Sequence, residues 1–171
     1  MEVPAVVVAY DPMWPVEFEE LRGRVDAALR GIDHTVEHVG STAVPGLDAK
    51  PIVDVDVVVP RHREVRAATV ALTGAGWRHR GDLGIAGRDA FDPPADGCYH
   101  HLYIVVAGTT AHCDHVDLRD YLRANPDEAA RYAALKHGLA PLLAVDRSAY
   151  VEAKSAFIKE LLERARGQAA T

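Results

Sequence analysis

The segment from Pro51 to Val59 most limits how this chain can fold, because it is a run of β-branched residues that contains two acids and stops at Pro60. Such a run predicts a β-strand. Side chains alternate between the two faces of a strand, so Asp54 and Asp56 are expected on the same face. Ile52 and Val58 would share that face, and the opposite face would hold Val53, Val55 and Val57. A strand that is apolar on both faces is usually covered by other elements.

Two neighbouring carboxylates in a covered strand need compensation, because burial and mutual repulsion both oppose their charges. A divalent cation compensates them well. Mg²⁺ takes oxygen ligands and is commonly shared between one or two carboxylates and substrate phosphates. We therefore predict that Asp54 and Asp56 bind Mg²⁺ or Mn²⁺ and take part in catalysis. The alternative for this pattern is an edge strand whose acids lie in solvent.

A glycine-serine turn precedes the acidic strand, in the segment 38–47 (HVGSTAVPGL). Gly40 permits a backbone conformation and a close approach that a side chain would block. Ser41 and Thr42 offer hydroxyl and backbone N–H groups, which hold phosphate oxygens where a short helical turn begins. Lys50 adds a positive charge directed at the same phosphates. Taken alone, a turn of this kind is more often a hairpin or a helix cap than a ligand site.

The hydrophobic pattern predicts helices and strands that alternate without a regular βαβ period. This order favours an α+β fold, in which helices pack against a small mixed β-sheet and the C-terminal part is helical. The expected helices include 14–31, 63–72 and 147–166. A further helical region begins at 116–124, and the next helix is expected to begin at Pro126 with Asn125 as its N-cap. The expected strands are 35–39, 51–59, 77–80 and 101–107, with a loop at 81–97.

Length and charge narrow the classes of function. A chain of 171 residues, 49% of them hydrophobic, is long enough for one full core, so we expect a single domain over residues 1–171. The net charge of −6 argues against non-specific nucleic-acid binding, although a local basic cleft can still hold phosphates. Apolar runs stay far below the roughly 18 residues of a membrane span. With only Cys98 and Cys113 and no secretory signal, we expect a cytoplasmic protein.

The turn and the acids together resemble the signature of the nucleotidyltransferase superfamily, in which a Gly-Ser turn holds phosphates and two acids on a strand hold the metal. The longer segment 38–54 (HVGSTAVPGLDAKPIVD) resembles the hallmark of the GrpB family, also catalogued as an uncharacterised protein family. The resemblance extends over nearly the whole chain. It includes Tyr10-Asp-Pro-Met-Trp14 with Phe18, then Arg119-Asp-Tyr-Leu-Arg123, Tyr132, Leu135-Lys136, Tyr150 and Lys154. It implies a nucleotidyltransferase-like fold and no established substrate, and some relatives carry this domain attached to dephospho-coenzyme A kinase.

One feature departs from the active superfamily, in which a third acid on a later strand faces the pair. The corresponding segment, His101 to Ala107, contains no acid, and Tyr103 stands where the GrpB family tends to have a second histidine. A histidine can serve as a general base near neutral pH, whereas tyrosine is a poor base. We therefore expect His101 to lie beside the aspartates as a catalytic residue. Asp117 is the plausible replacement acid.

Other residues have weaker claims to chemistry. Arg119 and Arg123 stand one helical turn apart and are expected to bind phosphate, and Arg88 and Lys136 are further candidates. For each of them a solvated surface charge is at least as good an interpretation. His38 either orders the glycine-serine turn or is a core histidine. A zinc site would draw on Cys98, His100, His101, His112, Cys113 and His115, but their spacing fits no standard zinc motif.

Two functions follow from these residues. The first is a metal-dependent transferase that moves a nucleotidyl group from a nucleoside triphosphate to an unknown acceptor, using Asp54, Asp56 and His101. Gly40, Ser41, Thr42, Lys50, Arg119 and Arg123 would bind the nucleotide. The alternative is a non-catalytic regulatory module that binds a nucleotide or a coenzyme A precursor with the same fold. The sequence leaves the oligomeric state open.

Overall fold

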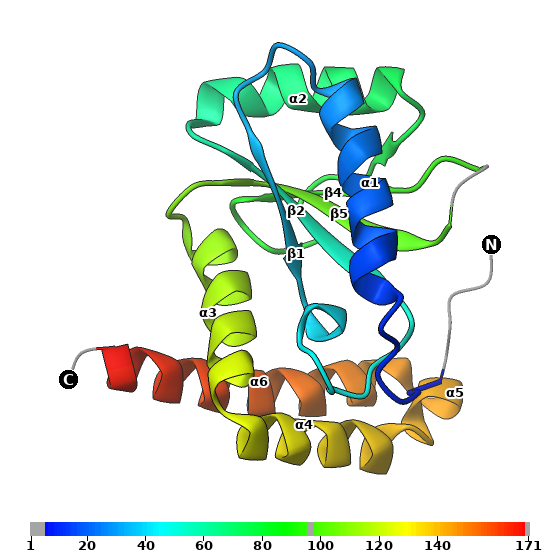
Figure 1. Cartoon of the computed structure of the whole chain (residues 1–171), viewed down its shortest axis with the longest axis vertical. Coiled ribbons are helices and arrows are strands. Elements are labelled where there is room, and N and C mark those ends of the chain that lie inside the picture. The colour runs from blue at the N-terminus through cyan, green and yellow to red at the C-terminus, as the bar shows by residue number, and fades with distance from the viewer. Residues whose placement is uncertain (1–5, 96–97, 170–171) are drawn as a thin grey trace.

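The computed structural model describes residues 6–95 and 98–169 and has a five-stranded sheet at its centre (Figure 1). The strand order is β1-β2-β5-β4-β3. β2 and β5 run parallel and every other neighbouring pair runs antiparallel, so the predicted small mixed sheet is confirmed. The strands are β1 (Thr35–Val39), β2 (Val53–Val59), β3 (Arg78–His79), β4 (Arg88–Asp92) and β5 (His100–Val106).

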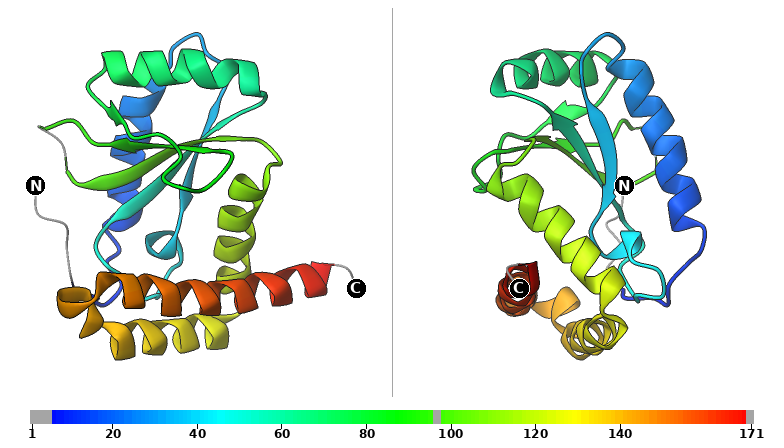
Figure 2. Two further views of the ribbon diagram at one scale, coloured as in Figure 1. Left: turned by 180° about the vertical axis from the view of Figure 1, so that it is seen from behind. Right: turned by 60° about the vertical axis from the view of Figure 1, so that its left-hand side comes forward.

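Helices cover both faces of the sheet and one of its ends. Figures 1 and 2 show α1 and α2 on one side, α3 descending along the other, and α4 and α6 lying side by side below the strands. A short 3-10 helix, η1, follows β1. The helices are α1 (Trp14–Ala28), η1 (Ser41–Ala43), α2 (His62–Gly74), α3 (Thr110–Ala124), α4 (Pro126–Leu139), α5 (Leu142–Val145) and α6 (Arg147–Ala169).

The main core lies between the sheet and the pair α1 and α2. One face of α1 is buried there, with Phe18 and Val25 packed on the sheet. Alternate residues of the two central strands complete this core, as the two-residue period requires. They are Val53, Val55, Val57 and Val59 of β2 and Leu102, Ile104 and Val106 of β5. Trp77 is buried against them.

The helical C-terminal part has a core of its own. Tyr121, Leu122, Tyr132 and Leu161 bring α3, α4 and α6 together around Val44 and Leu47, which follow η1. The turn after β1 is therefore clamped between the sheet and the C-terminal helices. This packing places α3 and α6 opposite the sheet face that carries Asp54 and Asp56.

Two predictions about elements were wrong, and a third was right only in part. β4 lies inside the predicted loop 81–97, because pairing with β5 fixes a strand that has a polar sequence. The last two residues of that predicted loop fall outside the described ones. α3 begins at Thr110 and not at 116. Asn125 stands at the N-cap of α4, but its side chain donates a hydrogen bond back to Tyr121 O at 2.8 Å and makes no cap bond.

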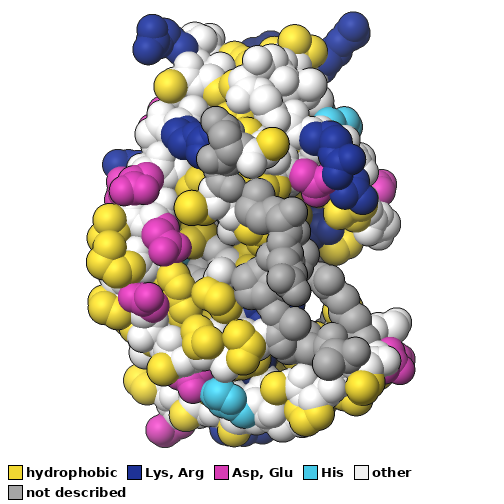
Figure 3. Space-filling model, turned by 90° about the vertical axis from the view of Figure 1, so that its right-hand side faces the viewer, with side chains coloured by type: hydrophobic (Ala, Val, Ile, Leu, Met, Phe, Trp, Pro, Cys, Tyr) yellow, Lys and Arg dark blue, Asp and Glu magenta, His cyan; other side chains and the backbone are white. Residues whose placement is uncertain are grey.

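The outer surface carries charges of both signs. The face seen in Figure 3 has most of its Lys and Arg in the upper half, whereas acidic and hydrophobic side chains lie in both halves. None of the described helices is both long and apolar enough to cross a membrane.

Candidate functional site

The two aspartates lie on the sheet face that α3 covers. β2 is an interior strand between β1 and β5, which excludes the edge-strand alternative. Asp54 and Asp56 share the face with Val58, as predicted, and the valines between them face the main core. Asp56 is fully buried, whereas 27% of the Asp54 side chain remains exposed. Only Asp54 therefore meets solvent directly.

Each aspartate is hydrogen-bonded to one histidine. Nδ1 of His101, on the neighbouring strand β5, donates to Asp54 Oδ1 at 2.7 Å. Nδ1 of His115, on α3, lies 2.8 Å from Asp56 Oδ2 and 3.1 Å from its Oδ1. The structure thus places His101 beside the pair, as the sequence led us to expect. It also adds His115, which sequence analysis had considered only as a zinc ligand.

The two carboxyl groups differ in their pKa values. Burial alone would raise the pKa of Asp54, but the hydrogen bond and the charge of His101 outweigh burial and lower it. For Asp56, burial outweighs the bond from His115 and raises the pKa. Burial acts to lower the pKa of His115, yet its bond to Asp56 raises that pKa above the usual value.

The glycine-serine turn lies directly against Asp54. Gly40 has φ 71° and ψ −169°, and a Cβ on it would lie 2.2 Å from Asp54 Oδ2. The predicted close approach is therefore made, and it is made by the protein's own carboxylate. Thr42 is buried, and its Oγ1 donates to Ile52 O at 3.3 Å and lies 3.0 Å from His38 Nε2. Burial lowers the pKa of His38 to about 4, so a neutral His38 orders the turn from inside the core.

A cavity of about 410 Å³ opens between this sheet face and α3, α4 and α6. Ser41, Asp54, His101 and His115 line its polar part. Apolar and aromatic side chains, among them Leu118, Leu122, Tyr132, Tyr150 and Ile158, line much of the rest. Four cationic side chains also face it, namely Lys50, Arg88, Lys136 and Lys154. Asp54 is the sole acid among the described lining residues, so the cavity favours an anionic ligand.

Two of the lysines that line the cavity differ in their pKa values. Lys136 is 2% exposed and donates to Asp48 O, and burial together with the charge of Lys154 lowers its pKa to about 7. The Tyr132 side chain raises the pKa of Lys154, and its effect is larger than the lowering effect of burial. Asp54 also raises this pKa. At neutral pH Lys154 is charged, while Lys136 is close to its midpoint.

Arg88 is held by an aromatic ring. Its Cζ lies 4.4 Å from the centre of the Tyr103 ring, on the same face as Asp54 and Asp56. Its Nε is buried, and no described residue accepts a hydrogen bond from it. Burial raises the pKa of Tyr103, which keeps its hydroxyl protonated. An unsatisfied guanidinium at the wall of a cavity is a natural partner for an anion.

Five residues that the sequence placed at the site are not among the described residues that line the cavity: the buried Asp56 and Thr42, and Arg119, Arg123 and Asp117. Arg119 donates to Glu37 Oε2 and His38 O, and Arg123 donates to Ala43 O at 2.7 and 2.9 Å. Both arginines therefore brace β1 and η1 from α3, and neither is among the described residues that line the cavity. Asp117 accepts from Arg166 Nε at 3.1 Å and is likewise absent from that lining.

The arrangement does not fit a divalent ion shared by the two aspartates. Both Asp56 oxygens already accept from His115, one Asp54 oxygen accepts from His101, and the other lies against Gly40. Within the described part of the chain, no three side chains of His, Cys, Asp or Glu are grouped to hold a metal. The zinc site considered from the sequence meets the same result, because His100 points to the other sheet face and accepts from Trp77 Nε1 at 3.0 Å.

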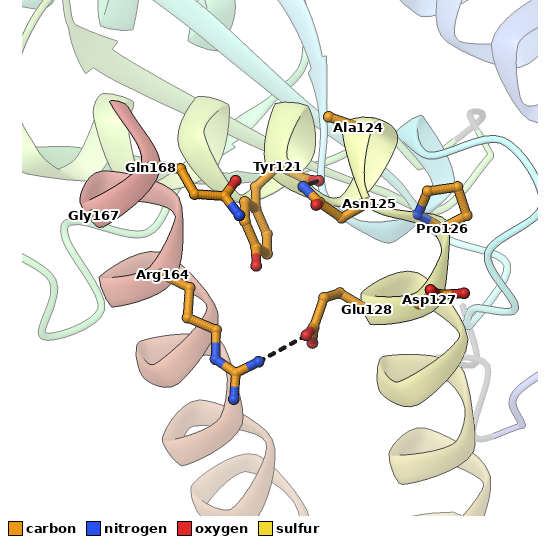
Figure 4. Close-up of a pocket in the computed structure, with 9 residues that line it drawn as sticks. All are labelled: Tyr121, Ala124, Asn125, Pro126, Asp127, Glu128, Arg164, Gly167 and Gln168. Atoms are coloured by element: carbon orange, nitrogen blue, oxygen red, sulfur yellow. Dashed lines mark hydrogen bonds and ion pairs between the residues drawn. The ribbon is translucent and has the colours of Figure 1, made fainter. Parts of the chain in front are cut away.

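A second hollow, of about 630 Å³, lies where α3 meets α4 beside the end of α6 (Figure 4). Its walls carry Tyr121, Asn125, Asp127 and Gln168. Arg164 crosses it to Glu128 Oε1 at 2.7 Å, so its one charged donor is already paired with an acid. It contains none of the residues described above as facing the aspartates, and we place the functional site in the first cavity.

The sheet, the two aspartates on β2 and the turn packed on them define a nucleotidyltransferase-like fold. Cid1 poly(U) polymerase, solved with MgGTP, aligns with a TM-score of 0.57 at 14% identity over 77% of this chain and 44% of its own, which is a likeness of fold. The chain belongs to the GrpB family, whose model, described as GrpB protein, matches residues 4–164.

Relatives within the family are similar over most of the chain. The GrpB protein of Enterococcus faecalis has a solved structure with a TM-score of 0.85 and 32% identity, covering 97% of this chain and 100% of that one. A UPF0157 protein of Pseudomonas aeruginosa is 36% identical over 93% of this chain. The match covers 66% of that relative, so this chain spans slightly less than two thirds of its length.

Proposed function

We propose that the protein binds a nucleoside triphosphate or a related phosphate ligand in the cavity between the sheet and the C-terminal helices, as a non-catalytic or regulatory module. The observation that carries this proposal is the charge of the cavity wall. Lys50, Arg88 and Lys154 face one cavity in which Asp54 is the sole acid among the described lining residues. Multiple cations around a confined space attract polyanions such as phosphate esters.

The rest of the wall supports a ligand that also has an organic part. Tyr132, Tyr150, Leu118 and Leu122 provide apolar and aromatic surface next to the cations. Ligand pockets of this kind bind mostly through apolar contact and use a few polar groups for orientation. Ser41 and Lys50 keep their proposed contacts with phosphate. Nucleotides and coenzyme A precursors both combine phosphate with such a moiety.

Thermal unfolding tests the proposal, because a ligand that binds only the folded state raises the melting temperature. ATP and dephospho-coenzyme A would be screened as probes, each with and without Mg²⁺. We expect at least one to raise the melting temperature, and Lys50→Glu to abolish the shift. Lys159→Glu makes the same charge change at an exposed position of α6 outside the cavity lining and should leave the shift intact. No shift with any probe would contradict the proposal.

Metal-dependent nucleotidyl transfer is the second candidate, with Asp54, Asp56 and His101 as its catalytic residues and Mg²⁺ or Mn²⁺ as its cofactor. It is favoured by the shared face of the two aspartates beside the glycine-serine turn. It requires His115 to release Asp56, and it lacks a third acid, because Asp117 is paired with Arg166. The geometry therefore supports binding better than transfer.

An incorporation assay separates the two candidates. Labelled ATP and UTP would be incubated with the protein, Mg²⁺ or Mn²⁺, and RNA, protein and small-molecule acceptors. Binding without transfer predicts no label in any acceptor. Label that appears with the parent protein and disappears with Asp54→Asn would establish transfer instead.

A further inference from the structure

We propose that Arg88, in place of a divalent metal, supplies the positive charge that holds a phosphate group in the cavity next to Asp54. This inference rests on the proposed function and specifies how the cavity recognises phosphate. It names a binding residue on β4, a strand that sequence analysis had assigned to a loop. It also makes ligand binding independent of Mg²⁺.

The geometry of Arg88 is that of a prepared anion site. Stacking on Tyr103 at 4.4 Å fixes the plane of the guanidinium, so little side-chain freedom remains to be lost when an anion binds. Its Nε is buried, and among the described residues no acceptor satisfies that nitrogen and no carboxylate forms an ion pair with it. A buried donor without a partner is costly, and a phosphate oxygen would satisfy it.

The aspartates are occupied in a way that complements this role. His101 and His115 donate to Asp54 and Asp56, which satisfies the carboxylates that would otherwise attract a cation. The Tyr103 ring neighbours both histidines, with its centre 6.2 Å from that of His101 and 5.8 Å from that of His115. Arg88 is stacked on the same ring and is thus a cation beside the acidic pair. No acid among the described residues forms an ion pair with Arg88.

Calorimetric titration with ATP tests this inference in two independent ways. In EDTA, the parent protein should bind ATP with an affinity within about threefold of that in Mg²⁺. Arg88→Gln should weaken binding by about tenfold to a hundredfold, because a charge-assisted bond to phosphate is lost. Arg88→Lys should fall between the two, since lysine keeps the charge and loses the planar donor fork. Arg80→Gln, on the same hairpin but paired with Asp92 outside the cavity lining, is the matched control.

The outcomes distinguish this inference from the proposed function. If the parent protein binds none of the probes, both fail. If it binds ATP in Mg²⁺ and loses binding in EDTA, the cavity binds phosphate but the metal-free role of Arg88 is wrong. The role of Arg88 is also wrong if the parent protein, Arg88→Lys and Arg88→Gln all bind ATP with the same affinity. If Arg88→Gln proves too unstable to titrate, the metal comparison and Arg88→Lys still decide.

Discussion

The contact between Gly40 and Asp54 shows how one residue fixes the position of another across the turn. With φ 71° and ψ −169°, Gly40 has a backbone conformation that other residues rarely adopt. Its missing side chain leaves room for the Asp54 carboxylate, which in turn accepts a hydrogen bond from His101. The turn, the acid and the histidine therefore depend on one another.

We expect Gly40→Ala to lower the free energy of unfolding by about 3 kcal/mol, through backbone strain and overlap with Asp54. Urea unfolding measures this directly. Gly23→Ala is the matched control, because Gly23 lies inside α1 with no atom within 4 Å of the place where an alanine Cβ would lie, and it should gain about 0.5–1 kcal/mol. A loss below about 1 kcal/mol for Gly40→Ala would mean that the turn yields easily and does not hold Asp54.

Ser41 and Lys50 line the cavity, and the proposed function gives them contacts with the ligand and not with the core. Ser41→Ala and Lys50→Ala should weaken ATP binding while leaving the free energy of unfolding within about 1 kcal/mol of the parent. Calorimetry and urea unfolding on the same samples separate these effects. Lost stability with unchanged affinity would make either residue structural.

The sequence predicted the shared face of Asp54 and Asp56 because the period of a strand is a local property. It did not reveal the role of His115, because α3 was expected to begin later, at 116. With α3 starting at Thr110, His112, His115 and Arg119 recur at helical spacing and face Glu37 and Asp56. The helical spacing of His112, His115 and Arg119 was the signal that could have identified these residues, had the helix been expected to begin earlier.

At the scale of elements, the turn at η1 is braced from α3. Arg123 spans from the helix to Ala43 O, and Arg119 spans to His38 O and Glu37. These arginines were expected at phosphates, because a charged pair one helical turn apart gives no indication of which acceptor it will meet. β4 was missed for a similar reason. Its sequence, RDAFD, has low strand propensity, and only its pairing with β5 makes it a strand.

We predict that Arg123→Met destabilises the protein by about 1–2 kcal/mol, because Ala43 O loses two hydrogen bonds from a charged donor. ATP affinity should fall less than in Lys50→Ala. Arg22→Met, which removes an exposed pair with Glu19 on α1, should change stability by less than about 0.5 kcal/mol. If Arg123→Met instead abolishes binding at unchanged stability, the sequence-based assignment to phosphate was right.

At the scale of the whole molecule, charge is distributed unevenly. The chain has a net charge of −6, yet four basic side chains meet in one cavity. Arg88 comes from β4, Lys136 from α4 and Lys154 from α6, with Lys50 preceding β2. Composition predicts the average surface, but these residues are brought together by tertiary packing alone. The sequence had offered Lys50, Arg88 and Lys136 one by one as phosphate ligands, but it could not show that they meet Lys154 in one cavity. The mixed sheet and the family, in contrast, were predicted from sequence patterns.

Lys136 should make the stability of the whole protein depend on pH. Its pKa is about 7 in the folded state against 10.5 as its ordinary value, because it is buried near Lys154 and only Asp48 offsets these effects. Between these two values the unfolded chain binds more protons than the folded one, so the free energy of unfolding should rise with pH. We expect a rise on the order of 3 kcal/mol between pH 7 and about 9.5. Above that range, Tyr103, Tyr150 and Lys154, whose folded pKa values are raised, act in the opposite direction.

Lys136→Met tests this prediction, since methionine has a similar shape and does not titrate. Urea unfolding of both proteins across pH 6 to 9.5 should give a rising curve for the parent and a flatter one for the variant. The variant should be the more stable of the two at pH 6, where the parent must bury a charged amine. Lys159→Met, which alters an exposed lysine on α6, should follow the parent curve. Parallel curves for the parent and Lys136→Met would show that Lys136 keeps its charge when folded, held by Asp48 O and the Tyr132 ring.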